Sequence, residues 1–137
     1  MNGKCRVIPY LVVDGVASAL EFYQDAFDAV EVRKVLRPDG TGIDHAEIRI
    51  GGSILLLADE FPPLNFYGPR KSGGSPVMMH LDLEDVDAAW LRAMRAGARE
   101  LRPLRNEVDG ERRGTLEDPY GHRWILAAEE RRRRVPR

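Results

Sequence analysis

The stretch VMMHLDLEDVDAAWLRAMRAG, residues 77–97, decides the fold of this chain of 137 residues. It begins with the alternation typical of a strand and continues with apolar residues at helical spacing, so it predicts a strand, a turn and a helix. The stretch VIPYLVVDGVASALEFYQDAF, residues 7–27, repeats this plan 70 positions earlier. Asp14 and Asp85 are the expected N-caps of the two helices, and Gly97 is the expected end of the second. Such an internal repeat predicts two copies of one structural unit.

The later part of each copy repeats as well. GGSILLLADE (51–60) aligns with YGHRWILAAEE (120–130) at an offset of 69, which pairs Leu56 with Ile125. Between the helix and this last strand, each copy has two more strand-like segments joined by a turn that contains Asp-Gly. The sequence therefore predicts an α+β fold of two βαβββ modules in a single domain. The expected bounds are 5–60 and 76–130 for the modules, 61–75 for a linker rich in Pro and Gly, and 131–137 for a basic tail.

A sheet that is covered by a helix on one face leaves its other face bare. Two such modules are expected to form a curved mixed sheet whose bare faces enclose a cup. Met78, His80 and Asp82 share one face of their strand, and we expect this face to line the cup. Trp90 and Trp124 are expected in the core, because each lies on the inward side of its element.

The overall composition excludes several classes of protein. A formal net charge of −1 argues against a general nucleic-acid binder. Neither a membrane span nor a signal-peptide core can be found in the sequence, so no membrane partner and a cytoplasmic location are expected. Cys5 is the single cysteine, which excludes an intrachain disulfide.

The segments YLVVDGVASALEFYQDAF, HAEIRIGGSILLLADE, HLDLEDVDAAWLRAMRAGA and DPYGHRWILA resemble the glyoxalase/bleomycin resistance protein/dioxygenase superfamily. This superfamily is also called the vicinal oxygen chelate (VOC) superfamily, and the resemblance is greatest to its PhnB-like branch. Asp28 departs from the pattern, because the family usually has Gly after the first helix. The resemblance implies a homodimer whose cups are completed across a two-fold axis. Whether the modules pair within one chain or between chains stays open.

The resemblance also implies where a metal would be held. It places the metal-ligand positions of the family on Ile8, Met78, Leu56 and Ile125. An aliphatic side chain cannot ligate a metal, and Met is a poor ligand for hard ions. We therefore expect no metal and no cofactor, and an apolar floor in which Met78 faces Ile8 across the cup.

The expected ligand-binding residues lie on the bare faces or in the linker above them. They are Ile8, Tyr10, His45, Glu47, Leu56, Phe66, Tyr67, Met78, His80 and Ile125. His80 has three interpretations: a contact to the ligand, a histidine satisfied by a backbone or carboxylate partner, or a displaced metal ligand. Glu47 is either a base or part of a solvated strand face. Phe66 and Tyr67 either cover the mouth of the cup or hold the linker down.

Three functions agree with these residues. The first is a metal-independent small-molecule binding protein of the glyoxalase/bleomycin resistance type, which sequesters an antibiotic or another bulky planar compound. The alternative is a lyase, isomerase or dioxygenase-type enzyme of the same superfamily, with Glu47 and His80 as candidate catalytic residues or with a relocated metal. The third is a protein-interaction module, and the arginine-rich tail is the only feature of the sequence that supports it. The sequence names neither the ligand nor the substrate.

Overall fold

The structure is a computed structural model, and it describes residues 3–129. The first module consists of β1 (Tyr10–Val13), α1 (Val16–Phe27), β2 (Val30–Leu36), β3 (Ile43–Ile50) and β4 (Ser53–Asp59). The second consists of β5 (Met78–Asp82), α3 (Val86–Ala96), β6 (Arg99–Asn106), β7 (Glu111–Glu117) and β8 (Arg123–Glu129). This order confirms the predicted βαβββ repeat. The basic tail expected at 131–137 lies outside the described residues.

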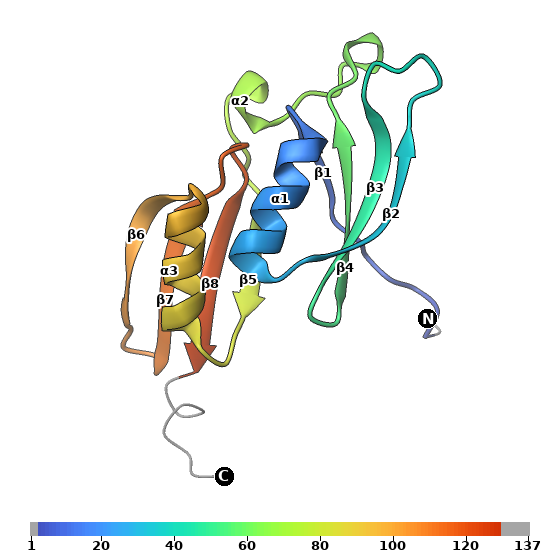
Figure 1. Ribbon diagram of the computed structural model, residues 1–137. Coiled ribbons are helices and arrows are strands. Elements are labelled where there is room, and N and C mark those ends of the chain that lie inside the picture. Colours follow the sequence, from blue (N-terminus) through green and yellow to red (C-terminus); the bar gives the residue numbers. More distant parts are fainter. Residues whose placement is uncertain (1–2, 130–137) are drawn as a thin grey trace.

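Each module folds into its own four-stranded mixed sheet. The strand orders are β1-β4-β3-β2 and β5-β8-β7-β6, and in each sheet the first strand runs parallel to its neighbour while the others are antiparallel. The two sheets are not hydrogen-bonded to each other within residues 3–129. Instead α1 packs against α3. In Figure 1, α3 lies over the strands of the second sheet, and α1 lies between this sheet and the first one. Within one chain both sheets are therefore open rather than closed into a common cup.

The core lies on the helix-covered side of both sheets. Alternate strand residues such as Val13, Leu57 and Leu116 are 0% exposed, whereas their neighbours within the strand are partly exposed. Trp124 is 2% exposed and Trp90 is 8% exposed, so both tryptophans belong to the core as predicted. One continuous hydrophobic cluster contains residues of both modules, so the two small sheets share one core.

The start of α1 differs from the expectation. Asp14 is not its N-cap; the N-cap position is Gly15, with a φ of 129°. The free amide of Val16 instead donates to Asp59 Oδ1 at 2.7 Å, and Asp59 Oδ2 accepts from the amide of Ile43 at 2.7 Å. A carboxylate at the end of β4 thus caps the helix from another element. In the second module Asp85 is the N-cap, as expected, and accepts from the amide of Ala88 at 3.1 Å.

Both helices end with a residue in the left-handed conformation. Gly97 ends α3 with a φ of 118°, as predicted. Asp28 ends α1 with a φ of 56° and a ψ of 34°, and its amide donates to the carbonyl of Tyr23. Asp at this position therefore adopts a conformation that favours glycine, which explains why glycine is usual there.

The segment between the modules contains a short 3₁₀ helix, Pro62–Leu64, and a one-turn helix, α2 (Pro69–Ser72). Phe61 and Phe66 pair as an isolated bridge around the first of these. Glu60 accepts from the amide of Gly68 at 2.9 Å and from Lys71 Nζ at 2.7 Å, which fixes the segment to the end of β4. No helix within residues 3–129 has the length and apolar character needed to cross a membrane.

Candidate ligand-binding site on the open sheet faces

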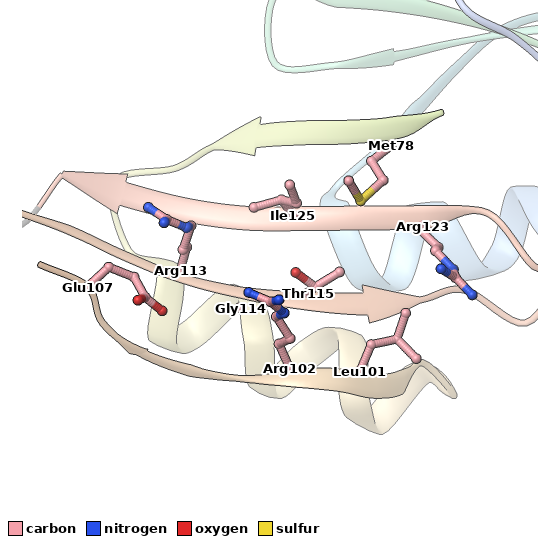
Figure 2. Close-up of a pocket in the computed structure, with 9 residues that line it drawn as sticks. All are labelled: Met78, Leu101, Arg102, Glu107, Arg113, Gly114, Thr115, Arg123 and Ile125. Atoms are coloured by element: carbon pink, nitrogen blue, oxygen red, sulfur yellow. The ribbon is translucent and has the colours of Figure 1, made fainter. Parts of the chain in front are cut away.

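The open face of the second sheet holds a hollow of about 490 Å³. Met78, Thr115 and Ile125 contribute to its lining from three adjacent strands, because Ile125 of β8 is paired with Thr115 of β7 on one side and with β5 on the other. Met78 is 51% exposed, so its thioether is available to a ligand. The remaining lining residues are Leu101, Arg102, Glu107, Arg113, Gly114 and Arg123 (Figure 2).

Two of the three arginines in this hollow are neutralised by carboxylates. Arg113 forms ion pairs with Asp109 at 2.8 Å and with Glu111 at 2.9 Å. The pKa of the Asp109 carboxyl is lowered, and the hydrogen bond that it accepts from Arg113 is the largest cause. Arg123 Nε lies 3.3 Å from Glu117 Oε2. Within residues 3–129 no carboxylate pairs with the third arginine, Arg102.

His80 lies on the open face but does not line this hollow. It pairs with Ile125 in the β5–β8 ladder, and its Nε2 atom lies 3.8 Å from Glu111 Oε2. A groove of about 730 Å³ is lined by His80 together with Ile8, the turn at 50–55 and the end of α1. The structure therefore brings Ile8 close to His80, whereas Met78 lies in the other hollow.

Four of the predicted residues meet on the open face of the first sheet. Tyr10 pairs with Leu56, and Leu56 pairs with Glu47 on the next strand. The Tyr10 hydroxyl lies 3.2 Å from His45 Nδ1, and the two rings meet edge to face at 5.8 Å. Burial, followed by the nearby charge of Asp44, raises the pKa of the Tyr10 hydroxyl above its ordinary value.

The linker aromatics are placed elsewhere. Phe66 is 52% exposed and lies opposite Phe61, whose ring is covered by the Arg37 guanidinium at 5.0 Å. Lys71 Nζ lies 5.7 Å from the centre of the Tyr67 ring. Neither Phe66 nor Tyr67 lines either of the two hollows described above.

The residues at the family's metal-ligand positions do not fit a metal. Leu56 and Ile125 occupy matching places on the central strands, next to Tyr10 and His80 of the first strands, which supports the alignment of the two modules. Their aliphatic side chains, like that of Ile8, carry no donor atom. Across residues 3–129 no three His, Cys, Asp or Glu side chains gather as a metal site would require.

The arginines and the threonine of the hollow were not among the ligand-binding residues predicted from the sequence. Arg113, Thr115 and Glu117 alternate on β7 with the buried Gly114 and Leu116. This alternation was available in the sequence and would have placed Arg113 and Thr115 on the open face. Arg102 was harder to place, because β6 pairs irregularly with β7 on both sides of it.

Comparison with known proteins identifies the class to which this fold belongs. Residues 6–126 match the profile of the Glyoxalase/Bleomycin resistance protein/Dioxygenase superfamily. The chain belongs to this superfamily, as its sequence motifs predicted.

Individual relatives agree with this membership. An uncharacterized protein of Mycobacterium tuberculosis, Rv0887c, is 44% identical over 129 residues, covering 92% of this chain and 75% of the relative. The X-ray structure of the Arabidopsis thaliana At5g48480 gene product superposes with a TM-score of 0.72 at 31% identity, covering 90% of this chain and 98% of that one. The fosfomycin resistance protein FosX of Listeria monocytogenes, complexed with Mn(II) and a dihydroxypropylphosphonic acid, shares the fold with a TM-score of 0.68 at 18% identity, covering 95% and 94% of the two chains.

Proposed function

We propose that the protein binds a small organic molecule on the open sheet faces, without a metal. One observation carries this proposal: a hollow of about 490 Å³ has Met78 and Ile125, two family metal-ligand positions, as its apolar floor. Filling these positions with an apolar side chain or a thioether removes the electrostatic reason for an ion to enter. It also provides a surface that suits an apolar or planar ligand.

The size and chemistry of the hollow support this proposal. Pockets for small molecules typically have volumes of roughly 300–1,000 Å³, with apolar walls and a few polar groups that orient the ligand. Here Thr115 and the arginines are such polar groups. The fosfomycin resistance protein FosX has a similar fold, and sequestration of an antibiotic or another bulky planar compound is the biological role that we propose.

We further propose that the binding unit is a homodimer. Each chain leaves one face of each sheet open, with Tyr10 and Met78 both 51% exposed. Within residues 3–129 the strands β1 and β5 are also free at their outer edges. A second copy that places its first sheet beside the second sheet of its partner would enclose both faces. Leu56 of one chain would then complete the floor formed by Ile125 of the other, which a single chain does not achieve.

One observation favours an enzymatic alternative within the same superfamily. The Tyr10 hydroxyl and His45 Nδ1 are 3.2 Å apart, and Glu47 lies on the same face two residues from His45. Such groups transfer protons in lyases and isomerases. Glu47 and His80 belong to different sheets, so a catalytic site that uses both residues would also need the dimer. A relocated metal bound by His45, Glu47 and His80 would need the dimer for the same reason.

Titration with the neutral planar fluorophore N-phenyl-1-naphthylamine tests the proposed function. We expect saturable binding that Met78→Glu weakens at least tenfold, because a carboxylate on the floor has to be desolvated when the ligand binds. Leu91→Glu is the matched control, since Leu91 is 54% exposed on the solvent side of α3. Equal affinities in all three proteins would place the fluorophore elsewhere and contradict the proposal.

Metal analysis separates the proposed function from the enzymatic alternative. Protein purified without added metal should contain zinc, nickel, manganese or iron at far less than one ion per chain. A stoichiometric ion that is lost in His80→Ala or Glu47→Gln would instead favour the enzyme with a relocated metal.

A further inference from the structure

We propose that the ligand of the hollow on the second sheet is an organic anion, and that Arg102 is the residue that selects it. The anionic group would be a carboxylate, sulfonate or phosphonate attached to an apolar, planar body. This inference rests on the proposed function, because it names the class of ligand for the same hollow. It depends on the charge pattern around Met78, Thr115 and Ile125.

Arg102 lies where its guanidinium can reach a ligand on the apolar floor. It belongs to the edge strand β6 and pairs with Thr115, which in turn pairs with Ile125. A guanidinium, a hydroxyl and an aliphatic side chain therefore follow one another across three adjacent strands. In Figure 2 the Arg102 guanidinium lies beside Thr115, on the side of the sheet from which Met78 and Ile125 project.

The charge of Arg102 has no counter-charge among the described residues. Within residues 3–129 its side chain has neither an ion pair nor a hydrogen bond, whereas Arg113 and Arg123 are both paired with carboxylates. Glu107 is the one carboxylate among the nine lining residues, and it accepts a hydrogen bond from Arg105 at 2.9 Å. The lining of the hollow therefore has an excess of positive charge.

The corresponding row of residues in the first sheet has a different charge pattern. In the first sheet the corresponding row runs from Arg33 to Glu47 and on to Leu56. There the strand neighbour of the arginine is a carboxylate, whereas Arg102 has the hydroxyl of Thr115 beside it. A carboxylate beside Arg102 would compete with an anionic ligand, while a hydroxyl can donate one more hydrogen bond to it.

The chemistry of the arginine then specifies the ligand. A guanidinium offers donors in a planar fork that binds a carboxylate, sulfonate or phosphonate through two parallel hydrogen bonds. Arg102 is exposed, so the contact would form at the rim of the hollow and would be weakened by added salt. Met78 and Ile125 provide the apolar surface for the remainder of the molecule. A neutral ligand of the same shape would gain only the contact with this apolar surface and not the hydrogen bonds from Arg102.

Two fluorophores that differ by one anionic group test this inference. N-Phenyl-1-naphthylamine is neutral, and 8-anilinonaphthalene-1-sulfonate has the same ring system with a sulfonate. We expect Arg102→Gln to weaken binding of the sulfonate about tenfold, the usual worth of a charge-assisted contact, and to leave binding of the neutral compound unchanged. Added salt should weaken binding of the sulfonate to the wild type more than to Arg102→Gln.

Two further variants control for general effects of charge. Arg95→Gln removes a positive charge from the exposed last turn of α3 and should change neither affinity. Arg102→Lys retains the charge but not the planar fork, so it should recover only part of the sulfonate affinity. Because the Arg102 side chain has no ion pair or hydrogen bond within residues 3–129, Arg102→Gln should unfold at the wild-type temperature.

The possible outcomes distinguish this inference from the proposed function. If the wild type binds neither fluorophore, or binds the neutral one with no effect of Met78→Glu, the proposed function fails and this inference fails with it. If the neutral fluorophore binds on the Met78 floor but Arg102→Gln leaves the sulfonate affinity unchanged, or lowers both affinities equally, only the assignment of an anionic ligand to Arg102 is overturned.

Discussion

The Tyr23 hydroxyl donates a hydrogen bond of 2.5 Å to Asp118 Oδ2, and this contact joins α1 of the first module to the turn before β8 of the second. Tyr23 is 0% exposed and Asp118 is 3% exposed. The same carboxylate accepts from Trp124 Nε1 at 2.9 Å and from the amides of Tyr120 and His122 at 2.9 and 3.0 Å. A buried carboxylate is tolerated here because four donors replace the water that it loses.

We expect Tyr23→Phe to lower the free energy of unfolding by about 1–3 kcal/mol, because it removes one donor from a buried carboxylate. Urea denaturation followed by circular dichroism measures this change. Tyr67→Phe is the control, since the Tyr67 hydroxyl has no hydrogen bond to residues 3–129. A loss of the same size in both variants would mean that the bond to Asp118 contributes nothing of its own.

The same contact predicts how stability depends on alkaline pH. Burial, followed by the charge and hydrogen bond of Asp118, raises the pKa of the Tyr23 phenol well above its ordinary value of 10.0. The unfolded chain therefore loses this proton at a lower pH than the folded chain. The contribution of Tyr23 to stability is complete below about pH 10 and is lost as the pH rises beyond that value. Thermal unfolding between about pH 9 and 11 should show a steeper loss in the wild type than in Tyr23→Phe; equal slopes would contradict this assignment.

Glycine should be favourable at both helix ends, so introducing it at one end and removing it from the other should change stability in opposite directions. Asp28→Gly should raise the free energy of unfolding by about 0.5–1 kcal/mol, because it relieves a left-handed conformation. The ion pair that is lost, Asp28 to Arg92 at 3.3 Å, contributes little because the Asp28 side chain is 82% exposed. Gly97→Ala should lower the same quantity by about 1 kcal/mol. Denaturant titrations of both variants measure the two changes in the free energy of unfolding, and an increase for Gly97→Ala would refute the argument.

Gly114 leaves room for Trp90. A Cβ atom at this position would lie 2.7 and 2.8 Å from two ring atoms of Trp90 and 3.0 Å from the Leu104 Cα atom. Gly114→Ala should therefore cost about 1–3 kcal/mol through overpacking. Gly52→Ala is the control, because within residues 3–129 no atom lies within 4 Å of the place that a Cβ atom would take there, and its φ is outside the left-handed region. If both variants unfold at the same urea concentration, the close approach of Trp90 has no energetic consequence.

The proposed homodimer makes a prediction about mass. Sedimentation velocity should give a species of twice the 15.5 kDa chain. The dimer should persist on dilution to low micromolar concentrations, since enclosing two sheet faces buries a large interface. A monomer at every concentration would count against the dimer and against a floor shared by Leu56 and Ile125.

Much of the fold could be predicted from the sequence, because the repeat of residues 7–27 at 77–97 depends on local periodicity. Features that depend on contacts between distant elements could not be predicted in this way. Asp59 replaces Asp14 as the cap of α1 only because β4 ends beside the helix. Asp118 likewise meets Tyr23 only after the two modules have packed together.

The candidate site was predictable in part for the same reason. The open-face positions of Tyr10, Met78 and Ile125 follow from strand alternation, as does the burial of Trp124. Arg102 could not be assigned to the hollow, because the irregular pairing of β6 shifts its register by an amount that the sequence does not reveal. Its lack of an ion pair within residues 3–129 depends on where the carboxylates of the folded chain come to lie.

The contacts that join the modules lie away from the open sheet faces. Besides Asp118 and Tyr23, they include the Tyr120 hydroxyl bonded to Ser18 Oγ at 2.8 Å and His122 Nε2 bonded to the Val12 carbonyl at 2.9 Å. Substitutions at Met78, Thr115 or Arg102 therefore leave this joint intact. On the proposed function, substitutions at these positions would change the compound that is bound with little loss of stability, so a single scaffold could give rise to proteins of many specificities.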